Sequence, residues 1–278
     1  MYKLKNGSIK VEIIDPKKDA HLLGSRYCSG GYIFQIEDAA KGRVLSGPTF
    51  GSGSFNTFDG QGAPEVFLNA LCEEKAGVGD LVLVPGVGTV IRTSDITPFH
   101  ARNNPNVKEF SVWDIVCRPQ EFEARARQVL DEYDFDIIRR VSLEQRRVIS
   151  ATTFTNREKS INLRWFPHPF FPPGVCRFVN RITVPENPGY FVNEQGWVEQ
   201  KPDYDWSKGL FQPLTIMGDE PFHAVIKHPL VGSVDALCDY AAAVLPMWAN
   251  SRALSFEPYF EKTVGAGESA SWKIEYSL

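Results

Sequence analysis

The sequence lacks the features that mark several common classes of protein. Its five cysteines are widely spaced and form no C-x-x-C pair, so neither a disulfide framework nor a zinc knuckle is indicated. Lysine and arginine form no basic run and the net charge is −4, whereas binding to a phosphate backbone requires a basic surface. We therefore predict reduced, mostly buried thiols and no nucleic-acid partner.

Long apolar runs are also absent. No stretch is as long as the roughly 18 apolar residues that a membrane-spanning helix needs. The first residues, MYKLKNGSIKVEIID, alternate between polar and apolar instead of forming the apolar region of a secretion signal. The sequence therefore predicts a cytoplasmic protein without a membrane partner.

Several motifs of well-known enzyme classes are missing. The chain contains no G-x-S-x-G, no G-x-x-x-x-G-K-[ST] and no H-E-x-x-H motif, which removes the main support for a nucleophile-elbow hydrolase, a P-loop enzyme or a zincin. Residues 51–62, GSGSFNTFDGQG, are rich in glycine, but no strand pattern precedes them and no helix pattern follows. We interpret them as a flexible surface loop and not as a phosphate-binding loop.

What the sequence does contain is alternation of apolar and polar residues. Residues 2–13, YKLKNGSIKVEI, alternate on both sides of Asn6-Gly7, which predicts a β-hairpin with a type I′ turn. Turn-forming residues, among them 22 glycines and 19 prolines, separate further strand-like runs. These runs cover residues 31–37, 80–84, 112–116, 137–143, 147–155, 161–166, 222–227 and 270–276.

One segment fits two patterns. Between Pro119 and Tyr133 the apolar residues suit a helix, while Phe122, Ala124 and Ala126 suit a strand equally well. No internal repeat and no change of composition marks a linker. We predict one all-β domain over residues 1–278, with two sheets packed face to face and few short helices.

His168 lies in the segment RWFPHPFF, between Pro167 and Pro169. Proline fixes its own φ and favours an extended conformation for the residue before it, so the imidazole is held on a stiff backbone. In an extended run, Arg164 and Phe166 share a face with His168 and form a polar pocket with an aromatic floor. The local sequence fits both a rigid turn packed with aromatic rings and a catalytic acid in a fixed position.

Glu257 is the second ionisable residue that a proline holds extended. It precedes Pro258 and lies between Phe256 and Tyr259. Desolvation among aromatic rings raises the pKa of a carboxyl, which suits a general base that works near neutral pH. The alternative is a glutamate at the end of a strand that points into solvent.

Three further residues are candidates for binding. His100 lies in the polar stretch TPFHARNNP, where it suits the rim of a binding site or an ordinary surface position. Asp205 and Trp206, in KPDYDWSKG, place a carboxylate beside an aromatic ring. That pair suits a sugar, whose apolar face packs on a ring while its hydroxyls bind carboxylates, and it also suits an ordinary loop.

Taken together, these motifs resemble those of the galactose mutarotase-like superfamily, which includes aldose 1-epimerases and hexose-6-phosphate mutarotases. The residues 168–171, HPFF, are similar to its H-x-[YF]-F motif, and the residues 256–276 are similar to its glutamate motif and closing strand. The segments HLLGSRY at 21–27 and GYI at 31–33 are similar to the region of its first sheet.

The resemblance implies a fold, a reaction and the residues that perform it. The fold is a β-supersandwich of two large, mostly antiparallel sheets, with a strand from Phe122 onward. Glu257 takes the proton from the anomeric hydroxyl and His168 protonates the ring oxygen from the opposite side of the sugar ring, so that the ring opens and recloses with either configuration. The partner is a sugar or sugar phosphate, and no metal or organic cofactor is required.

The sequence also departs from the family. The earlier histidine of galactose mutarotases has no match, and His100 is its nearest equivalent by position only. Hexose-6-phosphate mutarotases bind the phosphate with several basic residues, for which only Arg26 and Arg164 suggest themselves. The substrate is therefore left open between a hexose and a hexose phosphate.

Three hypotheses follow from the sequence. The first is an aldose 1-epimerase-like isomerase, a hypothesis that fails if His168 and Glu257 do not face each other across a pocket as wide as a pyranose ring. The second is a carbohydrate-binding protein of the same fold without catalysis. The third is a lyase or hydrolase for acidic sugars, which would need further acids and arginines around the cleft.

Overall fold

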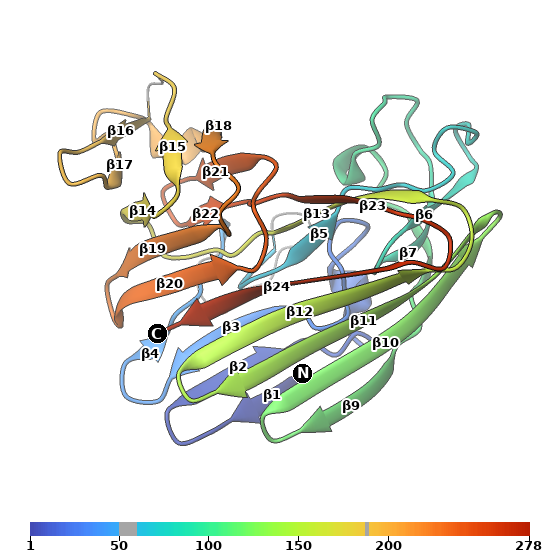
Figure 1. Ribbon diagram of the computed structural model, residues 1–278, viewed down its shortest axis with the longest axis horizontal. Helices are drawn as coiled ribbons and strands as arrows, with labels where there is room; N and C mark the ends of the chain where they lie inside the picture. The colour runs from blue at the N-terminus through green and yellow to red at the C-terminus, as the bar shows by residue number, and fades with distance from the viewer. Residues whose placement is uncertain (50–59, 187–188) are drawn as a thin grey trace.

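The regular secondary structure of the described residues is almost entirely β-strand, as the alternation in the sequence predicts (Figure 1). The computed structural model describes residues 1–49, 60–186 and 189–278. Its helical segments within these ranges are single 3₁₀ turns: η1 (Ala20–Leu22), η2 (Ala101–Asn103) and η3 (Trp206–Lys208). None of the helices found in the described ranges has the length and hydropathy needed to cross a bilayer.

A ten-stranded sheet forms one layer of the molecule. Its long neighbouring strands pair antiparallel, and in each of them every second side chain is buried, because successive side chains of a strand point to opposite faces. In spatial order the strands are β16 (Tyr190–Val192), β17 (Val198–Gln200), β14 (Cys176–Phe178), β19 (His223–His228), β20 (Gly232–Cys238), β24 (Ser269–Ser277), β12 (Arg147–Asn156), β11 (Tyr133–Glu144), β10 (Glu121–Leu130) and β9 (Asp114–Arg118).

Four smaller sheets accompany this large one. The N-terminal sheet consists of β1 (Tyr2–Lys5), β2 (Ile9–Ile13), β3 (Ile33–Asp38) and β4 (Gly42–Arg43). One three-stranded sheet consists of β23 (Phe260–Val264), β13 (Ile161–Pro167) and β5 (Glu65–Phe67). A second three-stranded sheet consists of β6 (Leu81–Val84), β7 (Gly88–Ile91) and β8 (Val107–Phe110). The last sheet contains β15 (Arg181–Thr183), β18 (Leu210–Met217), β21 (Leu245–Ala249) and β22 (Leu254–Phe256).

The main hydrophobic core joins these layers. Val11 from the N-terminal sheet, Phe135 and Phe154 from the ten-stranded sheet and Met247 from β21 belong to one cluster of buried side chains. Each large apolar side chain that is fully buried stabilises the fold by about 1.5–3 kcal/mol. The prediction of an all-β sandwich is confirmed, and the layers opposite the ten-stranded sheet are divided into smaller sheets.

A row of aromatic rings fixes β13 and β23 against the large sheet. Trp272 of β24 lies 5.5 Å from Trp165 of β13 and stacks at 4.4 Å on Phe260 of β23, measured between ring centroids. Trp165 and Trp272 are almost completely buried. Because β13 leads directly into His168, this packing gives that residue a rigid support.

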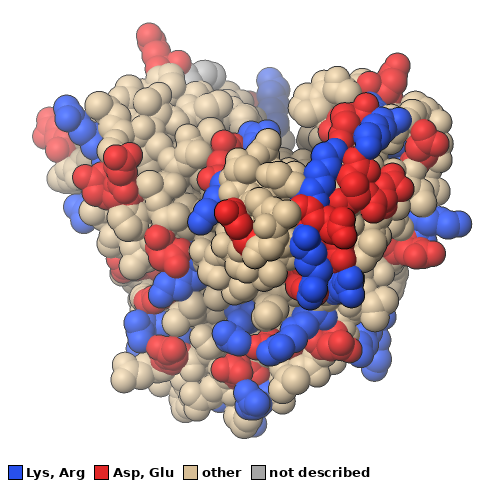
Figure 2. Space-filling view, turned by 45° about the vertical axis from the view of Figure 1, so that its right-hand side comes forward, with Lys and Arg blue, Asp and Glu red and all other residues tan. Residues whose placement is uncertain are grey.

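Opposite charges alternate between neighbouring strands on the outer face of the large sheet. Arg127 of β10 lies 2.6 Å from Asp134 of β11, and Arg147 of β12 lies 3.5 Å from Glu275 of β24. Figure 2 shows the same mixture of positive and negative side chains over one side of the molecule, without a large area of one sign. Such exposed pairs contribute at most about 1 kcal/mol each.

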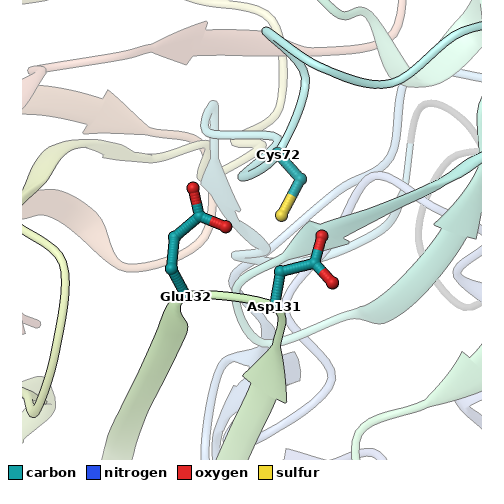
Figure 3. Close-up of side chains that lie close together, drawn as sticks. All are labelled: Cys72, Asp131 and Glu132. Atoms are coloured by element: carbon teal, nitrogen blue, oxygen red, sulfur yellow. The ribbon is translucent and has the colours of Figure 1, made fainter.

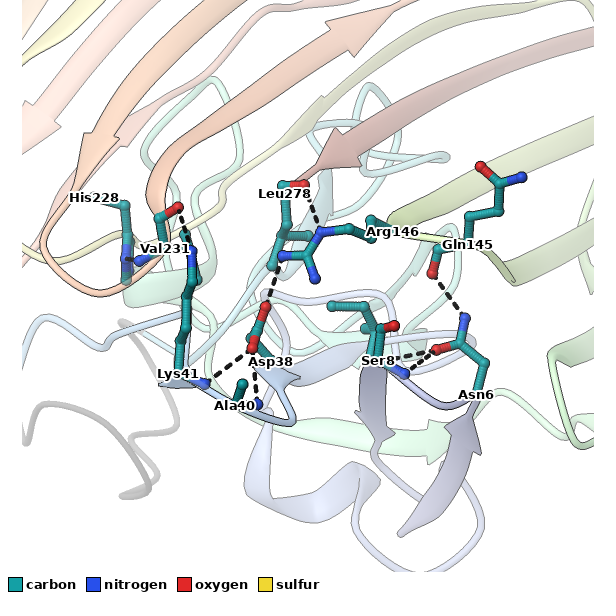
Figure 4. Close-up of polar contacts among 11 residues, drawn as sticks. Asn6, Ser8, Asp38, Ala40, Lys41, Gln145, Arg146, His228, Val231 and Leu278 are labelled. Carbon is teal, nitrogen blue, oxygen red and sulfur yellow. Dashed lines mark hydrogen bonds and ion pairs between the residues drawn. The ribbon is translucent and has the colours of Figure 1, made fainter.

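Polar contacts tie the N-terminal sheet to the turn between β11 and β12 (Figure 4). Arg146 lies 2.6 Å from the buried carboxylate of Asp38 and donates a 2.9 Å hydrogen bond to the carbonyl oxygen of Leu278. The side-chain amide of Asn6 donates to the carbonyl oxygen of Gln145 at 2.7 Å. The Arg146 guanidinium lowers the pKa of Asp38, so this connection is between charged groups.

The predicted strands are confirmed at β3, β11, β12 and β24, whereas the eight-residue strand β18 was not predicted. The prediction of a type I′ turn is wrong. The segment from Phe122 is strand β10. At the first hairpin, neither Asn6 nor Gly7 has the positive φ that a type I′ turn requires. Instead, the side-chain oxygen of Asn6 accepts hydrogen bonds from the backbone of Ser8 and Ile9. The predicted glycine-rich loop falls mostly on residues 51–59, outside the described residues.

Candidate functional site

The predicted acid, His168, lies immediately after β13 and is held by its backbone. Its N–H donates a 2.8 Å hydrogen bond to the carbonyl oxygen of Pro64, and Pro167 pairs with Glu65 of β5. The side chain is 4% exposed, and Phe170 packs against the imidazole with 4.4 Å between ring centroids. The two prolines therefore hold an extended, buried segment, as the sequence predicts.

The predicted base, Glu257, follows β22 directly. Its backbone N–H donates to the carbonyl oxygen of Pro246 at 2.9 Å, and the residue is 4% exposed. Phe171 and Leu254 form an antiparallel bridge, which places the segment that carries His168 beside β22. The two motifs are thus brought together by strand pairing although they are distant in sequence.

The side chains of His168 and Glu257 are in direct contact. His168 Nε2 lies 3.4 Å from Glu257 Oε1, and the hydroxyl of Tyr259 lies 3.5 Å from Glu257 Oε2. No pyranose ring fits between two groups at this distance, so the expectation that they act from opposite sides of the ring is wrong. The condition that the sequence set for an isomerase is therefore not met in the form stated. That condition overlooked that the anomeric hydroxyl and the ring oxygen of a pyranose are bonded to the same carbon, so that two groups in contact can reach both.

Burial shifts the pKa values of both groups in the direction of their neutral forms. Desolvation raises the pKa of Glu257 to about 7, against the opposing effect of the Arg26 charge. Desolvation holds the pKa of His168 well below its usual value, and the Arg26 charge lowers it further. Near neutral pH the site therefore contains the neutral imidazole of His168 beside the carboxyl of Glu257, which is partly ionised at that pH.

A pocket of about 430 Å³ opens beside this pair. Its size lies within the range of small-molecule sites. Both His168 and Glu257 line it, together with the basic residues Arg26, His100 and Arg102. The charges of Arg26 and Arg102 contribute to lowering the pKa of His100, after the larger effect of desolvation, so these three side chains are close enough to act on one ligand.

Aromatic rings form another part of the lining. Phe211 of β18 and Trp248 of β21 are directly opposite each other across two paired strands. Phe211 is 53% exposed, and Trp248 packs edge-on against Phe170 with 6.0 Å between centroids. A pocket with polar groups and an aromatic wall suits a sugar, which has hydroxyls at its rim and an apolar face.

The structure brings some of the predicted binding residues to this pocket and not others. Arg26 and His100 line it, whereas Arg164, Asp205 and Trp206 do not. Arg164 lies opposite Glu261 of β23 and is half exposed, and its guanidinium contacts that carboxylate at 2.9 Å instead of lining the pocket. These last three residues were predicted to bind the sugar, and they lie outside the lining of this pocket.

Asp205 and Trp206 have structural partners instead. The Asp205 carboxylate caps η3 and accepts a 2.6 Å hydrogen bond from the hydroxyl of Ser207. The Trp206 indole donates to the carbonyl oxygen of Lys201 and packs against Tyr190. This segment is the ordinary loop that the sequence also allowed.

Several site residues carry no signal in the sequence. Arg102 follows His100 at the start of η2, and Trp248 lies in a short apolar strand. Ser255 is fully buried, and its Oγ lies 2.6 Å from His168 Nδ1. Only the spacing of two residues between Ser255 and Glu257, which puts both on one side of an extended segment, could have indicated the serine.

One group of side chains has the composition of a metal site. Cys72, Asp131 and Glu132 place potential ligand atoms within 4.8 Å of one another (Figure 3). The Glu132 carboxylate is in contact with the ammonium groups of Lys75 and Lys159, and burial and the neighbouring acids raise the pKa of the Cys72 thiol to about 11. A thiol and a lysine-paired carboxylate do not form a competent ligand set.

The structure is similar to several solved structures, whereas the sequence comparisons found no match. No protein-family model and no curated protein sequence matches the chain. A galactose mutarotase related enzyme from Lactobacillus acidophilus has a TM-score of 0.62 and 11% identity, over 99% of this chain and 96% of that one. A galactose mutarotase-like protein from Lactobacillus casei has a TM-score of 0.56 and 13% identity, over 100% and 99%.

A third structure agrees with these two. An Escherichia coli K12 protein that bears the provisional name aldose 1-epimerase has a TM-score of 0.55 and 14% identity, over 99% of this chain and 97% of that one. The three similarities extend over nearly the whole of each chain. The chain described here therefore has the galactose mutarotase-like fold.

Proposed function

We propose that this protein is an aldose 1-epimerase-like isomerase that interconverts the α and β anomers of a hexose or hexose phosphate. The proposal rests on one observation above all: Glu257, with a pKa of about 7, touches the neutral imidazole of His168 at the wall of a sugar-sized pocket. The names of the structural neighbours support a sugar as the ligand. A cytoplasmic location and a single domain over residues 1–278 are part of the same proposal.

The contact between the two groups suits this reaction. An anomeric centre carries its hydroxyl and the ring oxygen on one carbon, so a base and an acid that act together must reach two neighbouring atoms. His168 Nε2 and Glu257 Oε1, 3.4 Å apart, reach such a pair from one side. A general base is most efficient when its pKa is near the working pH, which is the case for Glu257.

The proton transfers can be written in full. The Glu257 carboxylate takes the proton of the anomeric hydroxyl, whose oxygen becomes the carbonyl oxygen of the open-chain sugar. The bond between the anomeric carbon and the ring oxygen breaks, and the ring oxygen takes the proton of His168 Nε2. In the same step the Glu257 carboxyl gives its proton to Nε2 through the contact between them, so that the His168 ring is not left as an imidazolate anion and both side chains end as they began. After rotation about the neighbouring carbon–carbon bond, the same steps in reverse close the ring.

The rest of the pocket would select the sugar. Phe211 and Trp248 offer a surface for its apolar face, Arg26 and Arg102 supply positive charge, and His100 adds a hydrogen-bonding group. Arginine is well suited to phosphate, because its guanidinium group donates two parallel hydrogen bonds. The proposed reaction is carried by side chains of this chain and involves no metal or organic cofactor.

The lining of the pocket disfavours the hydrolase alternative. Among the lining residues that the structure describes, Glu257 is the single carboxylate. Hydrolysis of a glycosidic bond ordinarily uses two carboxylates that flank it. A lyase or hydrolase for acidic sugars is therefore the weaker hypothesis.

NMR exchange spectroscopy on dissolved sugars tests the proposal. We expect the protein to accelerate exchange between the anomers of glucose, galactose or glucose 6-phosphate, with a preference for the phosphorylated sugar if Arg26 and Arg102 bind the phosphate. The Arg102→Ala variant then separates the substrates, since its loss of rate should be confined to glucose 6-phosphate. Binding of a sugar without faster exchange would support the non-catalytic carbohydrate-binding protein instead.

A further inference from the structure

A buried serine lies on the side of His168 that faces away from Glu257. Ser255 Oγ is 2.6 Å from His168 Nδ1, while Glu257 Oε1 is 3.4 Å from Nε2 of the same ring. Ser255 is 0% exposed, and β22 places it opposite Trp248 of β21. Each ring nitrogen of His168 thus has its own fixed partner.

The position of the ring proton follows from the hydrogen-bond partners of Ser255. Among the hydrogen bonds of the described residues, His168 Nδ1 is the one partner of the serine hydroxyl. If Nδ1 carried the proton, the serine would accept that hydrogen bond and its own O–H would be buried without an acceptor. Buried donors without a partner are rare and cost about 1–3 kcal/mol. The serine therefore donates, Nδ1 accepts, and the ring proton lies on Nε2.

We propose that Ser255 is a positioning residue that holds His168 in the tautomer with the proton on Nε2. This tautomer presents an N–H to the pocket, beside the Glu257 carboxylate, where a ring oxygen would accept it. The catalytic meaning of the inference rests on the proposed isomerase function, whereas the tautomer itself does not. A neutral imidazole with its proton fixed by the hydrogen bond at the other nitrogen acts as a donor without first becoming charged.

Removal of the hydroxyl should release this control. In Ser255→Ala, Nδ1 loses its donor and the ring is free to carry its proton on either nitrogen. Molecules with the proton on Nδ1 present a lone pair to the ring oxygen and cannot protonate it. We expect kcat for anomer exchange to fall about tenfold or more, with KM within twofold of the wild type, because the change affects proton transfer and not sugar binding.

Nitrogen NMR of isotope-labelled histidine in the full chain measures the tautomer directly. We expect the His168 ring of the wild type to show a protonated Nε2 and an unprotonated Nδ1, and the His168→Gln variant identifies its signals by their loss. Ser255→Ala should shift these signals toward a mixture of tautomers, and Ser255→Cys, which keeps a weak donor, should lie between. Ser46→Ala is the matched control, since Ser46 is a buried serine that donates to the carbonyl oxygen of Arg252.

The outcomes decide the inference separately from the proposed function. A wild-type ring with its proton on Nδ1 overturns the inference, as does a Ser255→Ala variant whose tautomer and kcat match the wild type. A loss of kcat without a change of tautomer also overturns it, because Ser255 would then act only on structure. If no sugar is isomerised, the proposed function fails, and the ring spectrum still decides whether Ser255 fixes the tautomer.

Discussion

Two glutamates of this protein are equally buried and have opposite surroundings. Glu65 and Glu257 are each 4% exposed. Glu65 lies 2.5 Å from the guanidinium of Arg139 and accepts a 2.6 Å hydrogen bond from Ser150. Glu257 has His168 and the hydroxyl of Tyr259 as neighbours, at 3.4 and 3.5 Å.

The difference separates a structural carboxylate from a reactive one. Arg139 is 1% exposed and also donates hydrogen bonds to the carbonyl oxygen of Gly30 and to the hydroxyls of Ser150 and Thr152, so the Glu65 carboxylate lies against a buried cation that a hydrogen-bonded network holds in place. The direct contacts of Glu257 are with the neutral imidazole and a hydroxyl, and the Arg26 charge opposes desolvation only in part, so the pKa of Glu257 rises to about 7. Burial alone therefore does not make a carboxyl reactive; burial without a paired cation does.

Breaking the ion pair between Arg139 and Glu65 should have the largest effect on stability. In Arg139→Met, Glu65 keeps its burial and loses its cation, so we expect the free energy of unfolding to fall by about 3–5 kcal/mol. Urea denaturation followed by tryptophan fluorescence measures this change. The double variant Arg139→Met, Glu65→Gln removes the stranded charge and should recover part of the loss. A double variant as unstable as the single one would contradict the account of this network.

Replacing the reactive glutamate by glutamine, in Glu257→Gln, should stabilise the fold. The pKa of Glu257 is about 7 in the folded protein, above the usual value of an unfolded glutamate, so the protonated form favours folding and that stability is lost as the pH rises through about 7. Glu257→Gln has no such loss. The free energy of unfolding of Glu257→Gln should exceed that of the wild type by an amount that grows to on the order of 3 kcal/mol above pH ~8. Urea denaturation across pH measures the gap, and a gap that does not change with pH would disprove it.

The pH dependence of catalysis should report the ionisation of Glu257. The base form of Glu257 is the ionised one, so kcat/KM for anomer exchange should rise about tenfold per pH unit below its pKa and level off above about 7. The pKa of His168 lies well below its usual value, so its charging should affect the profile only at more acidic pH. A profile that falls between pH ~6 and ~8 would contradict the assignment of Glu257 as base.

The smallest effect is expected at an exposed ion pair beside the site. Arg164 and Glu261 are 47% and 36% exposed and contact each other outside the pocket. Exposed pairs contribute at most about 1 kcal/mol, so Arg164→Ala should change stability by less than that and leave kcat and KM near wild-type values. Steady-state exchange rates on the best substrate measure this. A large rise in KM would restore Arg164 as a sugar-binding residue.

Strands β11, β12 and β24 could be predicted from sequence because alternation over seven or more residues defines a face. Strand β10 also fitted a helix, and β18, in which Pro213 lies and only Leu214 is buried, was missed. Strands of two or three residues, such as β4 and β14, are too short to show a period. The turn at Asn6-Gly7 was predicted from the dipeptide, whereas the Asn6 side chain forms its own hydrogen bonds to the following backbone and selects another geometry. Local competition of this kind is visible only in the structure.

For the site, the sequence predicted the residues that proline marks and missed those that tertiary pairing supplies. His168 and Glu257 each lie next to a proline, and both line the pocket. Arg102 and Trp248 reach the same pocket from η2 and β21, and nothing in their local sequence shows this. The direct contact between acid and base follows from the pairing of distant strands, which no single motif specifies.

The central claim is that Glu257 is the base of an anomer exchange, and one measurement tests it most directly. NMR exchange spectroscopy compares wild type, Glu257→Gln and the matched control Glu261→Gln, whose glutamate is exposed in the neighbouring strand. We predict that Glu257→Gln slows exchange by about 100-fold or more, while Glu261→Gln stays within twofold of the wild type. A Glu257→Gln variant that exchanges anomers at the wild-type rate would contradict the account.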